Sequence, residues 1–183
     1  MSTRWLCAIG LVASLVGVAS ARANAQQLWR YPCDVMLPEA CFRLPNGMSV
    51  TYEVPADSGI YAVQQAGKDV VTLYAGQAPD RSKFSGAPVL VLDSRAHRLE
   101  VFVTPDEGRL RMDLLISPKK KGGALVHAFG FIDRGNATAI AYALSGLRPC
   151  TRQARESTRC STESSWGEEL STLIRSSGSL ASQ

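Results

Sequence analysis

His127 is the residue of this chain best placed to take part in proton transfer. It lies within a mostly apolar stretch, Ala124–Ile132, which predicts a β-strand. If the preceding turn is a five-residue loop, Ser117 pairs with Gly123 and Asp113 faces His127 on the neighbouring strand. A carboxylate at that place orients an imidazole, which is half of a general-base arrangement. The alternative interpretation is a cross-strand polar pair on the outer face of a sheet, and a one-residue change of register would separate the two residues.

The second histidine and the densest cluster of charge lie at predicted turns. His97 falls between two predicted strands, where we expect a solvated side chain. Lys119, Lys120 and Lys121 stand ahead of two glycines, as the basic tip of a hairpin. Such a tip could bind an acidic partner, a phosphate-rich envelope surface or nucleic acid, or it could simply keep the hairpin soluble. The other basic residues are scattered, so the sequence pI of 8.9 does not indicate a nucleic-acid-binding protein.

Sequence motifs of the common enzyme classes are missing. The chain contains no GxSxG nucleophile elbow, no HExxH metal motif and no GxxxxGK[ST] phosphate loop. It also lacks a GxGxxG followed by a helical pattern, and its acidic residues mostly mark turns. These observations favour a protein without catalytic activity and without a cofactor.

Cysteine usage indicates an oxidising compartment. Four of the five cysteines follow the first 25 residues: Cys33, Cys41, Cys150 and Cys160. An even number in an exported chain predicts disulfides, with three possible connectivities. Local pairing, Cys33 with Cys41 and Cys150 with Cys160, is favoured over a crossed arrangement because the intervening residues are typical of loops. A zinc site and a redox-active pair are both disfavoured because the chain has no CxxC, and neither histidine lies near a cysteine.

The first 25 residues have the pattern of a cleavable secretory signal peptide. Arg4 supplies a positive start, Trp5–Ala21 is apolar or small, and Ala23-Asn24-Ala25 offers a small-x-small cleavage site. An uncleaved anchor is the alternative, but the apolar run is at the short end for a membrane span. Of 20 basic and 16 acidic residues, two basic ones lie in this segment, so the mature chain has a net charge of +2. We therefore expect a periplasmic or secreted protein with no transmembrane segment after cleavage.

The elements that must position these residues are short strands followed by helices. Alternating or continuous apolar stretches predict strands over residues 48–54, 60–64, 69–75, 88–92, 98–104, 109–117 and 124–132. Apolar residues at helical spacing predict helices over 136–147, with Asn136 as N-cap, and from Trp166 onward. The prediction is an α+β fold: a mainly antiparallel, twisted sheet of about six or seven strands with two C-terminal helices packed on one face. Residues 26–175 would form a single disulfide-bonded domain, and 176–183 a disordered tail.

The pattern as a whole favours a small exported protein that binds a protein partner and is not an enzyme. Inhibitors and immunity proteins that block a lytic or toxic enzyme have this profile, although no motif identifies such a family. Two alternatives stay open: an assembly or secretion-apparatus accessory protein of the envelope, and a small hydrolase that uses His127 with Asp113. The apolar stripe of the last helix is expected to pack on its own domain, the alternative being a partner's groove.

Overall fold

The computed structural model describes residues 33–55, 58–77, 84, 86–107, 109–152, 158–161 and 166–180. These residues belong to one compact unit that spans Pro32–Gln183. The predicted signal peptide, residues 1–25, lies outside the described residues. No helix in the described part of the chain is long and apolar enough to cross a membrane.

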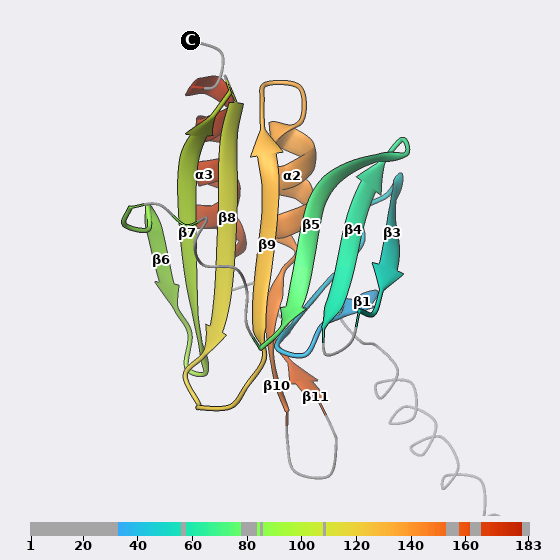
Figure 1. Cartoon of the computed structure of the whole chain (residues 1–183), viewed down its shortest axis with the longest axis vertical. Helices are drawn as coiled ribbons and strands as arrows, with labels where there is room; N and C mark the ends of the chain where they lie inside the picture. Colours follow the sequence, from blue (N-terminus) through green and yellow to red (C-terminus); the bar gives the residue numbers. More distant parts are fainter. Residues whose placement is uncertain are drawn as a thin grey trace, which may run out of the picture. The chain divides into compact units, whose positions relative to one another are not determined.

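A seven-stranded antiparallel sheet forms the centre of the unit, as the sequence predicts (Figure 1). Its strand order is β3-β4-β5-β9-β8-β7-β6, so two runs of hairpins meet where β5 pairs with β9. The strands are β3 (Met48–Glu53), β4 (Gly59–Gln65), β5 (Lys68–Gly76), β6 (Leu90–Asp93), β7 (His97–Asp106), β8 (Arg109–Pro118) and β9 (Leu125–Ile132). Each of them overlaps a stretch of predicted strand.

Alternation along the central strands separates an apolar face from a mixed one. Leu114 and Ile116 on β8 and Val126 and Ala128 on β9 are fully buried in the main core cluster. The residues between them point to the other face of the sheet, because successive side chains of a strand alternate. His127 lies on this second face.

A smaller four-stranded sheet holds the disulfides. Its strands are β1 (Val35–Met36), β2 (Ala40–Phe42), β10 (Arg148–Arg152) and β11 (Thr158–Cys160), in the order β1-β2-β10-β11. Cys33 is bonded to Cys41 and Cys150 to Cys160, so the prediction of local pairing is confirmed. The strands themselves were not predicted, because the loop-like composition between the cysteines masks two very short hairpins.

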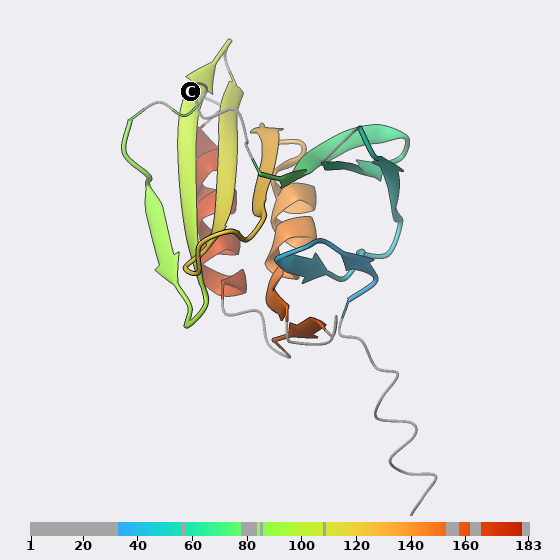
Figure 2. The ribbon, with the colours of Figure 1, turned by 60° about the horizontal axis from the view of Figure 1, so that its bottom comes forward.

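Two helices, α2 (Ala137–Ser145) and α3 (Gly167–Leu180), cover one face of the large sheet (Figures 1 and 2). Trp166, Leu170 and Ile174 are almost fully buried in the main core cluster, so α3 packs on its own domain, as expected. The fold class is therefore the predicted α+β arrangement.

Two details at the helix ends differ from the predictions. Asn136 occupies the N-cap position of α2, but its side chain makes no capping bond. Its Nδ2 instead donates to the Phe131 carbonyl, and its Oδ1 accepts from the Asp133 amide. The tail predicted to be disordered from Ser176 is helical as far as Leu180. Ser177 is buried there, because α3 lies close enough to α2 for small side chains to pack between them.

Candidate functional site

The structure brings His127 and Asp113 together, as the strand pattern predicts. His127 Nε2 and Asp113 Oδ1 are 2.9 Å apart. The predicted register, which paired Asp113 directly with His127, is wrong by two residues, however. In the structure Leu115 pairs with His127 and Asp113 pairs with Phe129. A shift of two residues leaves both side chains on the same face, because the side-chain period of a strand is two. The predicted contact is thus confirmed as a diagonal contact.

Arg111 completes this group and was missed by the sequence analysis. Its Nε donates to Asp113 Oδ2 and its Nη2 to Asp113 Oδ1, each at 2.8 Å. Burial alone would raise the pKa of Asp113, but the hydrogen bonds from Arg111 and His127 hold that pKa below its ordinary value. The sequence does carry a signal for this contact. Arg111 stands two residues before Asp113 on one strand, which places both side chains on the same face.

Aromatic rings close this network off from solvent. The exposed fraction of Asp113 is 1% and that of His127 is 6%. Phe84 meets the His127 ring edge-on at 5.0 Å, and the Arg111 guanidinium lies 5.0 Å above the Phe129 ring. Neither Asp113 nor His127 lines the cleft that lies at one end of the large sheet. A general base must reach its substrate, so this geometry is better suited to linking strands than to proton transfer.

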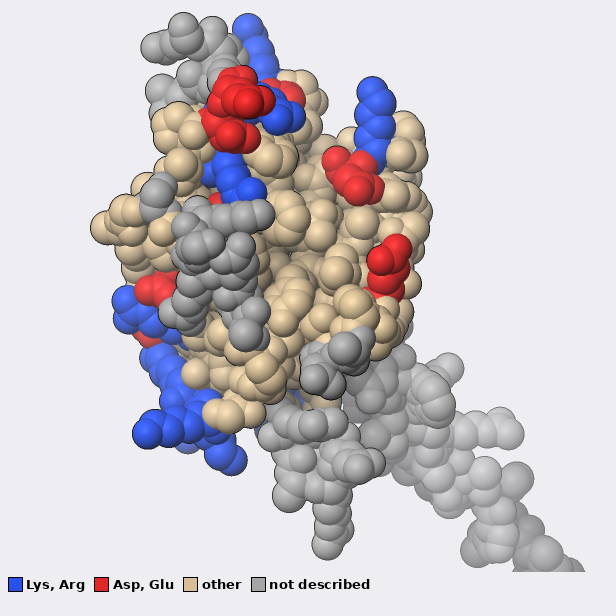
Figure 3. Space-filling view, in the orientation of Figure 1, with Lys and Arg blue, Asp and Glu red and all other residues tan. Residues whose placement is uncertain are grey.

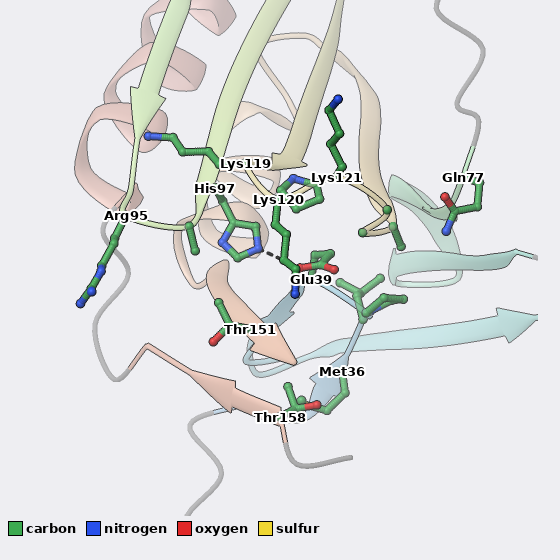
Figure 4. A pocket seen from close by; sticks show the side chains of 17 residues that line it. Met36, Glu39, Gln77, Arg95, His97, Lys119, Lys120, Lys121, Thr151 and Thr158 are labelled. Carbon is green, nitrogen blue, oxygen red and sulfur yellow. Dashed lines mark hydrogen bonds and ion pairs between the residues drawn. The ribbon is translucent and has the colours of Figure 1, made fainter. Parts of the chain in front are cut away.

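An open cleft of about 990 Å³ lies at one end of the large sheet. Its walls come from the β6–β7 turn, the β8–β9 connection, the β1–β2 hairpin and the strands β10 and β11 (Figure 4). The three predicted lysines line it together with Arg95, His97 and Glu39. The cleft therefore combines the lysine run, which is visible in the sequence, with segments whose structure the sequence does not predict.

A hydrogen-bonded histidine–glutamate pair forms part of the cleft wall. His97 Nε2 lies 2.9 Å from Glu39 Oε2, with side-chain exposures of 1% and 13%. The prediction of a solvated His97 is wrong, because His97 is the first residue of β7 and its side chain points inward. The turn that precedes it is closed by Ser94, whose Oγ accepts from the His97 amide at 3.0 Å. A carboxylate only accepts hydrogen bonds, so Nε2 of His97 carries the proton in this pair.

Glu39 connects the two sheets. Its carbonyl accepts a hydrogen bond from the Cys150 amide at 2.9 Å, within the small sheet. Its carboxylate reaches His97 on the large sheet and also lies against Gly123, where an added Cβ would be 2.9 Å from Glu39 Oε1. Gly123 therefore allows the β8–β9 connection to pass close to this carboxylate. The link depends on residues far apart in the chain, and no local pattern indicates it.

Positive charge gathers on the rim of the cleft. Lys119 Nζ lies 2.8 Å from Asp93 Oδ1, and this hydrogen bond lowers the pKa of Asp93 below its ordinary value. Lys120, Lys121 and Arg95 are exposed and have no carboxylate within 4.0 Å among the described residues. Figure 3 shows Lys and Arg atoms concentrated at the end of the sheet where the β8–β9 connection lies. In Figure 4, Lys120 points across the cleft toward Glu39, whereas Arg95 points away.

The four cysteines form a separate cluster, in which Cys33, Cys41 and Cys150 are buried and Cys160 is partly buried. The sulfur atoms of Cys41, Cys150 and Cys160 lie within 4.8 Å of one another, a spacing that a metal ion could bridge. All of them are engaged in disulfides. Metal binding requires a thiolate, which a disulfide sulfur does not offer. In the oxidised protein these residues are therefore cross-links.

The chain has no significant match among protein-family models, curated proteins or solved structures. Its function is therefore inferred from the geometry of its own residues.

Proposed function

We propose that this chain is an exported, non-enzymatic protein of the bacterial cell envelope that binds a protein partner through the basic cleft. An inhibitor or immunity protein for a lytic or toxic enzyme is the kind of protein that this description fits. The observation that carries the proposal is the cleft itself, an open concavity of about 990 Å³ bordered by three lysines and an arginine. The two disulfides and the apolar N-terminal pattern support an extracytoplasmic location.

The charge balance of the cleft supports an acidic partner. Glu39 is hydrogen-bonded to His97 and is the one carboxylate that lines the cleft, and Lys119 is paired with Asp93. The remaining cations are Lys120, Lys121 and Arg95, which leave the rim positively charged. A concentration of one sign of charge at a cleft accelerates the encounter with a partner of opposite charge and makes that encounter sensitive to salt.

A binding role also agrees with the state of the titratable groups. The Asp113–His127 pair is covered by aromatic rings, and the Glu39–His97 pair is engaged in joining two sheets. Each imidazole has a carboxylate as its partner, and the exposed charged residues that line the cleft are cations. Cations that are exposed on a rigid frame are suited to recognising a partner's surface.

The test is an affinity capture from envelope extracts of the native host, with three forms of the mature protein. These are the wild type, a Lys120→Glu/Lys121→Glu variant, and a Lys68→Glu control. Lys68 is exposed and begins β5, the strand whose far end leads to the cleft residue Gln77. We expect one stoichiometric protein to be retained by the wild type and the control and lost by the double variant.

The identity of the captured protein separates the kinds of binding. A lytic or toxic enzyme whose activity falls on addition of the protein supports an inhibitor. A constitutive envelope complex supports an accessory role. If the double variant retains the same proteins as the wild type, the cleft is not the binding surface and the proposal fails.

A further inference from the structure

We propose that the cleft accepts an extended, acidic segment of the partner polypeptide, one of whose carboxylates pairs with Lys120. This inference rests on the proposed function and specifies the chemistry of its ligand. Lys120 is the lysine of the run whose side chain points into the cleft in Figure 4. It is exposed and has no carboxylate within 4.0 Å among the described residues, so its charge is available to a ligand.

The side chains of Lys119 and Lys121 point in other directions than that of Lys120, and this difference assigns the ligand's carboxylate to Lys120. Lys119 is held outward by Asp93 at 2.8 Å, on the side of β6. Lys121 points away from Glu39 in the same view. These two residues add to the positive field at the entrance, whereas Lys120 offers the direct contact. A single ammonium group recognises one carboxylate oxygen and does not impose the paired geometry of a guanidinium.

The walls of the cleft favour a polypeptide over a phosphate-rich surface. Met36, Pro38 and Pro118 give it apolar surface, and Met36 is 38% exposed. Thr151 and Thr158 add hydroxyl groups. A peptide that carries acidic and apolar side chains in alternation matches both kinds of wall. A phosphate group would use only the cations and would leave the apolar walls of the cleft without a partner.

The size of the cleft also favours a polypeptide ligand. Its volume of about 990 Å³ is at the upper end of the range for sites that enclose a drug-sized ligand, and the cleft is open to solvent. A lone phosphate or carboxylate would leave most of this space to water. A short stretch of extended chain fills it and can continue beyond the opening.

The frame of the cleft is held in place before a ligand arrives. The Glu39–His97 pair joins the small sheet to the large one, and Gly123 packs against the Glu39 carboxylate. The Cys150–Cys160 disulfide joins β10 and β11, the strands that carry Thr151 and Thr158. A pre-organised site spends less of its binding energy on ordering its own residues, so even a short segment can be recognised.

The experiment measures fluorescence anisotropy of a labelled hexapeptide that alternates Glu and Leu, titrated with the purified mature protein at low salt. The matched probe replaces every Glu by Gln. Three forms of the protein are compared: wild type, Lys120→Ala, and the exposed control Lys68→Ala. Inorganic phosphate and phosphatidylglycerol vesicles are added as competitors in separate arms.

We expect the Glu peptide to bind and the Gln peptide to bind far more weakly. Lys120→Ala should weaken binding of the Glu peptide by about threefold to fivefold, as for one solvent-exposed ion pair, and Lys68→Ala should leave it unchanged. Equal binding of both peptides, or no effect of Lys120→Ala, would overturn the inference. Stronger binding to the vesicles than to the Glu peptide, lost in Lys120→Ala, would overturn it in favour of a phosphate-rich surface.

The failure of this inference can be told apart from failure of the proposed function. If the Glu peptide does not bind while the capture of a partner still depends on Lys120 and Lys121, the partner uses folded surface instead of an extended segment. The proposed function then stands and the inference is wrong. If capture is also independent of these lysines, both are wrong.

Discussion

Replacing Asp113 by alanine should destabilise the protein strongly, because this carboxylate accepts three hydrogen bonds in a buried place. Two of them come from Arg111 at 2.8 Å and one from His127 at 2.9 Å. Removing one partner of a buried, hydrogen-bonded ion pair costs about 3–5 kcal/mol, since the remaining charge is left uncompensated. The Arg111 side chain is 17% exposed and rests on the Phe129 ring, so part of its charge can be rehydrated. We therefore expect a loss of about 3 kcal/mol, the lower end of that range.

The assay is urea denaturation followed by circular dichroism. A loss of about 3 kcal/mol should lower the urea midpoint by about 1.5 M, for a slope of about 2 kcal/mol per M. Asp69→Asn is the control, because Asp69 is an exposed carboxylate whose partner is the Gln64 amide. It should change stability by less than about 0.5 kcal/mol. A loss below about 1 kcal/mol in Asp113→Ala would refute the reasoning, because it would mean that water replaces the carboxylate without penalty.

The lowered pKa of Asp113 gives this network a defined pH dependence. Because the pKa is lower in the folded protein than in the unfolded chain, the stabilisation is complete above the unfolded value of about 3.9. It is lost as the pH falls through the folded value. The wild type should therefore lose stability more steeply than Asp113→Ala below about pH 4, and the two should converge in acid. Parallel curves from pH 7 to pH 2 would contradict this.

Three further outcomes follow from the packing, the disulfides and one tyrosine. Gly178→Ala should lower stability by about 1–3 kcal/mol in thermal unfolding, since an added Cβ would collide with the Ala137 side chain on α2. Substituting Cys150 and Cys160 by alanine should cost about 3 kcal/mol, because the bond closes a loop with a sequence separation of 10. Burial, and after it the hydrogen bond with the Tyr52 hydroxyl, raise the pKa of Tyr61 to about 12, so absorbance at alkaline pH should show one tyrosine that ionises late.

Most of the large sheet could be predicted from the sequence because its strands carry their own signal. Along β8, the inward residues Met112, Leu114 and Ile116 alternate with residues of the opposite face, and the core confirms this alternation. The contact between His127 and Asp113 was predicted for the same reason. The register was not, because it depends on the conformation of the connection between β8 and β9. An error of two residues leaves the pattern of faces unchanged, so alternation cannot detect it.

The small sheet could not be predicted because three of its four strands are too short to show a period. β1 has two residues, while β2 and β11 have three each. Stretches of this length are ordered by their disulfides and by pairing with one another, and neither effect leaves an alternating pattern. The cysteine pairing could be predicted, since it follows from short loops in the sequence. The strands between the cysteines could not.

The candidate site, likewise, could be predicted from the sequence only in part. The lysines of the rim are a visible run in the sequence, but the ion pair beneath them joins Glu39 and His97, which are 58 residues apart. A histidine ahead of a strand resembles any polar turn residue until the hairpin that carries Glu39 is placed against it. This carboxylate also lies close to Gly123, so the residue that joins the sheets is next to the connection that carries Lys120. Binding of a partner at the rim should therefore depend on the Glu39–His97 contact, which the sequence does not reveal. Weakening this contact should reduce binding even though every cation of the rim is still present.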